Sequence, residues 1–193
     1  MSKDAKASIS FQDLMLHRIH EILLVASPYD AFILEEDGRL TQQILYEYLG
    51  MNLSYAPRVW HAKNAKTGLQ MLADRSYDLV IVMMRIADMD PITFGEKVKQ
   101  DFPDKPVILL AFDESEISTL PQKRLLKTID RVYIWSGNAN VFPAIIKNIE
   151  DSMNLERDHK IANIRSIVMV EDNPRYYSII LPLIYRTALR HAQ

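Results

Sequence analysis

The chain contains no cysteine among its 193 residues. Disulfide bonds, thiolate metal sites and cysteine nucleophiles are therefore excluded. Long hydrophobic runs are also missing, since no apolar stretch approaches the roughly 18–20 residues that a membrane-spanning helix needs. The opening residues, Met1 to Lys6, are mostly polar and do not begin a signal peptide. These absences predict a cytoplasmic protein without a membrane partner.

Charge of one sign is not in excess, because 23 basic residues stand against 25 acidic ones and the net charge is −2. Proteins that bind nucleic acids usually carry a basic surface, so we expect no nucleic-acid partner. Only five glycines are present, and they form no phosphate-binding loop. The five histidines lack metal-ligand spacing with other donors, and no serine lies in a nucleophile-elbow motif. We therefore do not expect an enzyme.

Short apolar runs recur along the chain and alternate with helical patterns. Four of them are near-continuous, as in strands that are buried on both faces of a parallel sheet: Ile22–Ala26, Leu79–Met84, Val107–Ala111 and Val132–Trp135. A weaker run, Arg58–Ala62, fits an edge strand. The helical patterns lie near residues 30–49, 65–75, 91–101, 114–127 and 140–154. This alternation predicts an α/β fold with a flavodoxin-like, doubly wound, five-stranded parallel sheet of order 2-1-3-4-5.

The segments on either side of this unit are less regular. Residues 1–20 form an N-terminal extension in which Ser10 and Asp13 have capping-box spacing, so we expect a helix over about 10–20. Its apolar stripe covers the core or, alternatively, makes a dimer contact. Residues 154–165 are polar and predict a linker or the fraying end of a helix.

The segment 78–91 reads DLVIVMMRIADMDP. It resembles the third strand and following loop of bacterial response-regulator receiver domains, and the resemblance extends over residues 21–153. In that family an acidic pair after the first strand binds Mg²⁺, an aspartate ending the third strand accepts a phosphoryl group, a threonine or serine ends the fourth strand and a lysine ends the fifth. The corresponding positions of this chain hold Ala26 and Ser27, Met83, Ala111 and Trp135, in that order.

The resemblance therefore implies a degenerate receiver. The thioether of Met83 has no anionic oxygen that could attack phosphorus or bind Mg²⁺. We expect a non-catalytic module of a two-component or phosphorelay protein, without a cofactor in residues 21–153. Receivers act through a surface of the fourth helix, fifth strand and fifth helix, so the expected partners are other domains of the parent protein or a signalling protein. The alternative is a flavodoxin-like domain that binds a small ligand.

Other uses of residues near this site remain open. Asp30, Asp88 and Asp90 form a possible cation-binding set, although Asp30 and Asp90 are also suited to cap or begin the helices that follow them. Met83 and Trp135 either line an apolar pocket for a ligand or belong to the filled core.

Residues 166–193 resemble the truncated start of a second receiver domain. Ser166–Val170 has the composition of a buried strand, and Glu171 and Asp172 occupy the acidic-pair positions before Pro174. In a complete second domain this pair would supply half of a Mg²⁺ site; the alternative is a simple loop that caps a helix. One strand and one helix cannot bury a core. We therefore expect this unit to dock onto its own first domain or, as the favoured arrangement, to form a homodimer with a second chain.

Overall fold

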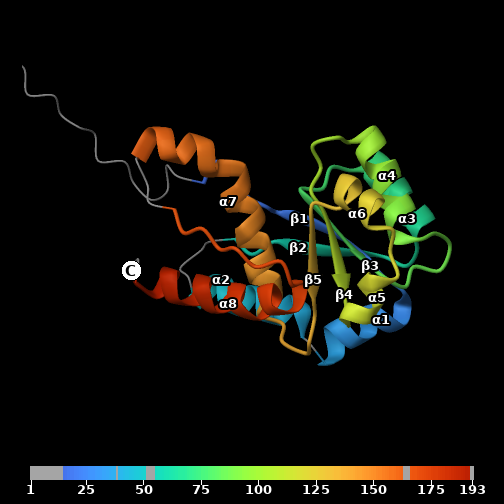
Figure 1. The fold of residues 1–193 in the computed structure, drawn as a ribbon, viewed down its shortest axis with the longest axis horizontal. Helices are drawn as coiled ribbons and strands as arrows, with labels where there is room; N and C mark the ends of the chain where they lie inside the picture. Colours follow the sequence, from blue (N-terminus) through green and yellow to red (C-terminus); the bar gives the residue numbers. More distant parts are fainter. Residues whose placement is uncertain (1–14, 38, 51–54, 163–165, 192–193) are drawn as a thin grey trace, which may run out of the picture.

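A five-stranded parallel sheet forms the centre of the computed structural model, which describes residues 15–37, 39–50, 55–162 and 166–191 (Figure 1). The strands are β1 Glu21–Val25, β2 Arg58–Ala62, β3 Leu79–Met83, β4 Val107–Ala111 and β5 Arg131–Ile134. Their order is β2-β1-β3-β4-β5, and every neighbouring pair is parallel. The predicted flavodoxin-like sheet is confirmed. All residues of the central strands β3 and β4 are buried, whereas β2 at the edge is partly exposed, as their compositions indicated.

Helices cover both faces of the sheet. The helical elements are α1 Pro28–Phe32, the π-helical turn η2 Ile33–Asp37, α2 Leu40–Gly50, α3 Ala65–Asp74, α4 Pro91–Asp101, α5 Glu114–Ser118, α6 Gln122–Thr128, α7 Val141–Ala162 and α8 Pro174–His191. One core cluster joins the sheet to η2, α2, α7 and α8, and a second joins it to α3, α4, α5 and α6. Alternate residues of β1 supply them, since Leu24 belongs to the first cluster and Leu23 to the second.

Two of the predicted helices are divided. The segment 30–49 forms α1, η2 and α2, and the segment 114–127 forms α5 and α6. Pro121 stands between α5 and α6, where a residue without a backbone N–H cannot continue the first helix. Asp90 and Pro91 begin α4 as the sequence indicated, with the Asp90 side chain accepting from the N–H groups of Ile92 and Thr93.

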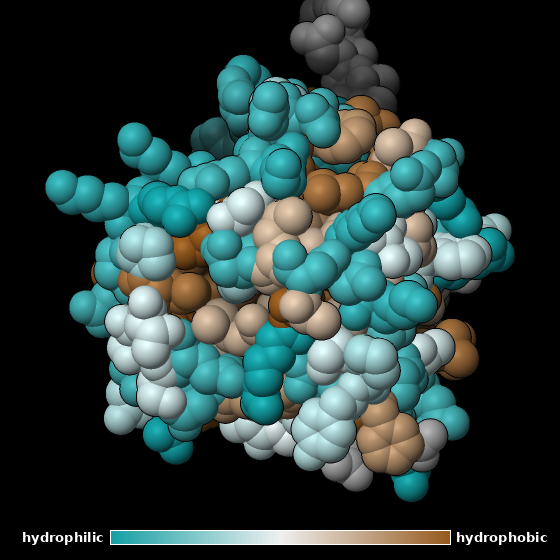
Figure 2. All heavy atoms as spheres, turned by 90° about the vertical axis from the view of Figure 1, so that its right-hand side faces the viewer, coloured by the Kyte–Doolittle hydropathy of each residue, from teal (hydrophilic) through white to brown (hydrophobic). Residues whose placement is uncertain are grey.

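The side of the molecule that carries α3 and α4 presents mostly hydrophilic side chains (Figure 2). Hydrophobic groups lie between them in separate areas. None of the helices among the described residues is long and apolar enough to cross a membrane.

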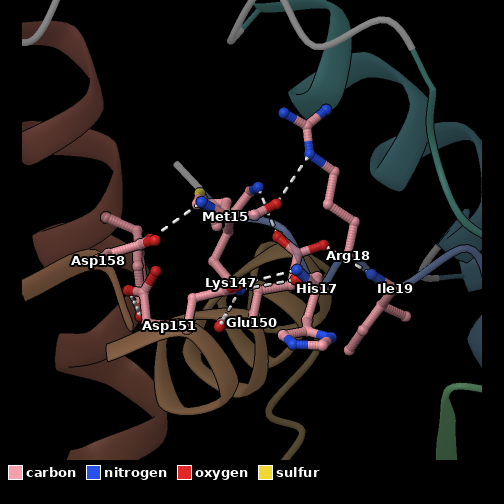
Figure 3. Close-up of polar contacts among 10 residues, drawn as sticks. Met15, His17, Arg18, Ile19, Lys147, Glu150, Asp151 and Asp158 are labelled. Atoms are coloured by element: carbon pink, nitrogen blue, oxygen red, sulfur yellow. Dashed lines mark hydrogen bonds and ion pairs between the residues drawn. The ribbon is translucent and has the colours of Figure 1, made fainter. Parts of the chain in front are cut away.

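The prediction of an N-terminal helix over about 10–20 is wrong for residues 15–20, the part of it that the structure describes. Residues 15–20 form no helix and run alongside α7, and the remaining predicted helical residues lie outside the described ranges. Three backbone N–H groups of this segment bind α7 side chains (Figure 3): Met15 donates to Asp158 at 2.9 Å, His17 to Asn154 at 2.8 Å and Ile19 to Glu150 at 2.9 Å. Every second N–H therefore has an acceptor on α7, and this pairing replaces the internal hydrogen bonds of a helix.

The polar side chains on α7 that hold this segment are buried. Glu150 and Asn154 are each 1% exposed, and Lys147 is 5% exposed. Asn154 also donates to the His17 carbonyl at 2.7 Å, so one amide satisfies both backbone groups of a residue. Lys147 donates to Glu150 at 2.7 Å and supplies the opposite charge that a buried carboxylate needs. We call the set Glu150, Asn154 and Asp158 the α7 polar row.

Of the two alternatives for residues 154–165, a linker or the fraying end of a helix, the structure has the helix, because α7 continues through Ala162. Asn154 and Asp158 in this stretch are buried against the N-terminal segment and are not exposed to solvent. Residues 163–165 lie outside the described ranges.

In the C-terminal segment the predicted helix is present, but the predicted strand before it is not. Residues 166–170 form no strand, and Ile167, Val168 and Val170 are exposed. The helix is present as α8, and it packs against α7 and β5 of its own chain (Figure 1). Of the two arrangements expected for this unit, the helix has the docked one, within its own chain.

Replacing Asn154 with leucine should lower the free energy of unfolding by about 1–3 kcal/mol, because the partly buried N–H and C=O of His17 would lose their partners. Chemical denaturation measures this change. Ser152→Ala is the matched control on the exposed side of α7, and it should cost less than about 0.5 kcal/mol. Equal effects of the two substitutions would contradict a role for the α7 polar row in holding residues 15–20.

Candidate functional site

The carboxyl ends of the parallel strands bring four of the predicted site residues to one edge of the sheet. Ala26 follows β1, Met83 ends β3, Ala111 ends β4 and Trp135 follows β5. Their exposed fractions are 0%, 1%, 0% and 6%. The sheet continues through two of them, because the Ala26 N–H donates to the Ala62 carbonyl and the Trp135 N–H donates to the Ala111 carbonyl. This edge therefore consists of buried, mostly apolar side chains.

Ser27, the fifth predicted site residue, is the N-cap of α1. Its hydroxyl accepts the N–H of Asp30 at 3.1 Å and caps α1, whose first residue is Pro28. The neighbouring Ala26 carbonyl lies 2.9 Å from the ring Nε2 of His61 at the end of β2. Ser27 and His61 thus fix the loop after β1 to the adjacent strand and helix.

An aromatic and charged cluster lies beside this edge, and sequence reasoning did not identify it. The rings of Phe112 and Trp135 meet edge to face at 5.5 Å between centroids, and the guanidinium of Arg85 lies 5.5 Å from the Phe112 ring centre. Glu116 pairs with Arg85 at 3.3 Å and accepts the Phe112 N–H at 3.0 Å. The position of Arg85 just after β3, and of Phe112 just after β4, was the available signal, since parallel strands bring such residues together.

The three carboxylates of the alternative cation-binding set do not act together: two of them cap different helices, and the third has no donor among the described residues. Asp90 caps α4, and Asp88 accepts the N–H groups of Ala65 and Lys66 at the start of α3, at 2.8 and 3.0 Å. Asp30 is 1% exposed, and no protein group among the described residues donates to its carboxylate. The described part of the chain contains no group of three or more His, Cys, Asp or Glu residues that could hold a metal.

Mg²⁺ takes six or so oxygen ligands, usually with one or two carboxylates at the centre of the set. At the carboxyl edge the structure offers methyl groups, a thioether, an indole and a serine hydroxyl that caps α1. These residues do not fit a magnesium ion.

Asp88 links the loop after β3 to α3. The backbone N–H of Lys66, followed by that of Ala65, holds the pKa of Asp88 below its usual value. A carboxylate at a helix N-terminus is favoured by the helix dipole as well as by these bonds. Asp88 thus acts as a second cap beside Asn64, whose side chain accepts the Thr67 N–H at 2.8 Å.

The outer edge of β5 is covered by α8. The Ser178 hydroxyl accepts the N–H of Ile134 at 2.9 Å and donates to the Pro174 carbonyl at 2.6 Å. The Tyr177 ring lies 5.7 Å from that of Tyr133, and Leu181 is 4% exposed. An edge strand otherwise presents unpaired backbone groups to other chains, so α8 closes this edge.

Glu171 and Asp172, the predicted half-site for Mg²⁺, lie in the turn before α8. Glu171 accepts the N–H of Asn173 at 2.9 Å, and the Asn173 side chain accepts from Arg175 and Tyr176. Asp172 is exposed. An open depression of about 570 Å³ lies between α3 and α4 and is lined in part by Asp88 and Met89 of the loop after β3. A small cavity lies between residues 15–20 and the side chains of Tyr48 and Lys147.

Neither a protein-family model nor a curated protein matches the sequence. Solved structures do match. The signal receiver domain of an HD domain-containing protein from Pseudomonas fluorescens is 25% identical with a TM-score of 0.54, and the match covers 74% of this chain and 95% of that one. The response regulator TrrA from Thermotoga maritima, in complex with Mg²⁺ and BeF, is 18% identical with a TM-score of 0.53, over 68% and 99%.

A third match is the receiver domain of a signal transduction histidine kinase from Syntrophus aciditrophicus, at 22% identity and a TM-score of 0.50, over 79% and 99% of the two chains. The chain has the fold of a response-regulator receiver domain. In the order of this receiver fold, α5 and α6 take the place of the fourth helix and α7 that of the fifth. The helix α8 is docked beside the strand that lies between them, β5.

Asp88→Asn should reduce stability at pH 7 by about 0.5–1 kcal/mol, because the charge at the N-terminus of α3 is lost. Since the folded pKa of Asp88 is lowered, its contribution is present above the unfolded value of about 4 and disappears as the pH falls below it. Urea unfolding at neutral and acidic pH should therefore show a difference between variant and wild type only at neutral pH. Asp104→Asn, in an exposed turn, is the control and should show no such pattern.

Ser178→Ala should remove the acceptor of the Ile134 N–H and lower stability by about 1–2 kcal/mol. Amide hydrogen exchange at Ile134 should become faster. Thr187→Ala, on the exposed side of α8, should leave this exchange rate unchanged. Unaltered protection of Ile134 in Ser178→Ala would mean that α8 does not close the β5 edge.

Proposed function

We propose that the chain is a pseudo-receiver: a non-catalytic signalling module of a bacterial two-component or phosphorelay protein that is not phosphorylated within residues 21–153. The observation that carries this proposal is Met83. It occupies the end of β3, where receivers have the phosphoryl-accepting aspartate, and only 1% of it is exposed. A buried thioether offers neither an anionic nucleophile nor a ligand for a hard cation.

The other positions of the receiver pattern support the same proposal. Ala26 and Ser27 replace the metal-binding pair, Ala111 replaces the hydroxyl residue and Trp135 replaces the lysine. Phosphoryl transfer depends on cations that neutralise the developing charge on the phosphoryl oxygens. The side chains at this edge supply no such cation, and the Arg85 guanidinium beside it is paired with Glu116.

A module of this kind transmits signals through contacts. In active receivers phosphorylation shifts the populations of two conformations of a contact surface. Here that shift must come from binding, either to other domains of the parent protein or to a separate signalling protein. We place the domain in the cytoplasm, as two-component modules generally require. Residues 166–193 are, on the same proposal, the start of a second receiver, in which Glu171 and Asp172 belong to a Mg²⁺ site that only the complete domain forms.

Acetyl phosphate with Mg²⁺ should leave the mass of the protein unchanged, and beryllofluoride with Mg²⁺ should not raise its melting temperature. The physical reason is the absence of acceptor, metal ligands and lysine at the strand ends. Intact-mass spectrometry and thermal unfolding measure the two effects, with TrrA from Thermotoga maritima as the positive control for beryllofluoride. Stoichiometric phosphorylation mapped to residues 21–153 would overturn the proposal.

Two substitutions at Met83 complete this test. Met83→Asp should not restore phosphorylation, because the metal ligands and the lysine are still missing, and a carboxylate in this buried position should cost at least about 2 kcal/mol. Met83→Leu keeps the volume and the apolar character, and it should cost less than about 1.5 kcal/mol.

A further inference from the structure

The small cavity beside residues 15–20 has the size and the surroundings of a water site. Four of the residues that line it are buried: Ile19, Tyr48, Lys147 and Glu150. His20 and Tyr55 also line it and are exposed, so the cavity adjoins the solvent. A cavity needs roughly 10–15 Å³ to hold one water molecule. The volume here is about 20 Å³, which admits a single one.

Tyr48 of α2 brings a buried hydroxyl group to this cavity. The residue is 3% exposed, and no protein group among the described residues forms a hydrogen bond with its hydroxyl. Burial raises the pKa of Tyr48, the negative charge of Glu150 raises it further, and the positive charge of Arg18 lowers it. The hydroxyl therefore lies close enough to these two charged residues of the cavity to interact with both. Buried hydroxyls in native proteins nearly always have a partner, either a protein group or an ordered water.

Lys147 and Glu150 supply the other hydrogen-bonding groups of the cavity (Figure 3). The Glu150 Oε1 accepts the N–H of Ile19 at 2.9 Å, and its Oε2 accepts from the Lys147 ammonium group at 2.7 Å. An ionised carboxylate has about four acceptor sites, and an ammonium group has three donors. Within the described part of the chain, both groups can therefore bind one more partner without giving up the contacts that they already make.

We propose that this cavity binds one water molecule, which connects the Tyr48 hydroxyl on α2 with Lys147 and Glu150 on α7. The water accepts from Tyr48 and Lys147 and donates to Glu150, which makes the three hydrogen bonds typical of a buried water. A neutral ligand suits the cavity better than an ion, because the charges of Lys147 and Glu150 already balance each other. Through this water the α7 polar row holds α2 as well as residues 15–20. The inference is independent of whether the domain is phosphorylated.

A high-resolution crystal structure of the full chain tests the site directly. It should show density for one water within about 3.2 Å of the Tyr48 hydroxyl and of a polar atom of Lys147 or Glu150. Two outcomes would overturn the proposal: a cavity without density, or a direct hydrogen bond between the Tyr48 hydroxyl and a protein group.

Tyrosine-to-phenylalanine substitutions test whether the Tyr48 hydroxyl has a partner in solution. Tyr48→Phe keeps the ring and its contact with the Lys147 ammonium group, 5.3 Å from the ring centre. It should lower the urea midpoint by on the order of 0.5 M, because one hydrogen bond is lost. Tyr133→Phe, which removes a hydrogen bond to Asn148, should have a similar effect, and Tyr46→Phe, at a 73% exposed position of α2, should have none. An unchanged or higher midpoint for Tyr48→Phe would mean that the hydroxyl has no partner and would refute the water site.

Magnetisation transfer from water measures occupancy of the site without crystals. In the wild-type chain with labelled isoleucine methyl groups, Ile19 should show a cross-peak with water, since it lines the cavity. Ile22 of β1 is buried as well and should show none. Relay through exchanging protons of Tyr48 or Lys147 would make the Ile19 signal vary with pH. A signal that varies in this way, or no signal at Ile19, would count against a bound water.

Discussion

Helix α7 organises the molecule because it binds each neighbour through a different kind of contact. Apolar residues such as Ile145 pack on the sheet, and the polar row holds the extended residues 15–20. The two backbones match in pitch, since four helical residues rise about 6 Å and two extended residues span about 6.6 Å. Each turn of α7 therefore meets one peptide group of the extended segment. The buried Lys147 neutralises the carboxylate at the sheet end of this row.

At the carboxyl ends of the strands the sheet is packed with apolar side chains. A cluster of carboxylates around a metal needs water and counter-charge, and it cannot pack tightly. Ala26, Met83 and Trp135 instead join one hydrophobic cluster, and Ala111 joins the other. The hydrophobic core thus extends to the ends of the strands.

The sheet could be predicted because its signal is local and repetitive. Five apolar strands between helical patterns leave few arrangements, and right-handed crossovers select the observed one. The positions of Ala26, Met83, Ala111 and Trp135 at one edge followed from the resemblance to receiver domains together with this topology. The extended N-terminal segment and the full length of α7 could not be predicted, for a shared reason. Asn154 and Asp158 are polar and suggested solvent, but their partners are backbone groups 137 and 143 residues away, which no local pattern reveals. The cluster of Arg85, Phe112 and Glu116 depends on similar long-range contacts.

The position of α8 makes the two edges of the sheet unequal. The β5 edge is closed by Ser178 and the aromatic ring of Tyr177, whereas β2 lies at the other end of the strand order. Copies of a sheet can add head to tail without limit only if each copy offers two open edges, because every addition must leave a new edge for the next one. A chain with one closed edge cannot propagate such a ribbon. By covering the β5 edge, the docked helix α8 therefore prevents edge-to-edge polymerisation of the sheet.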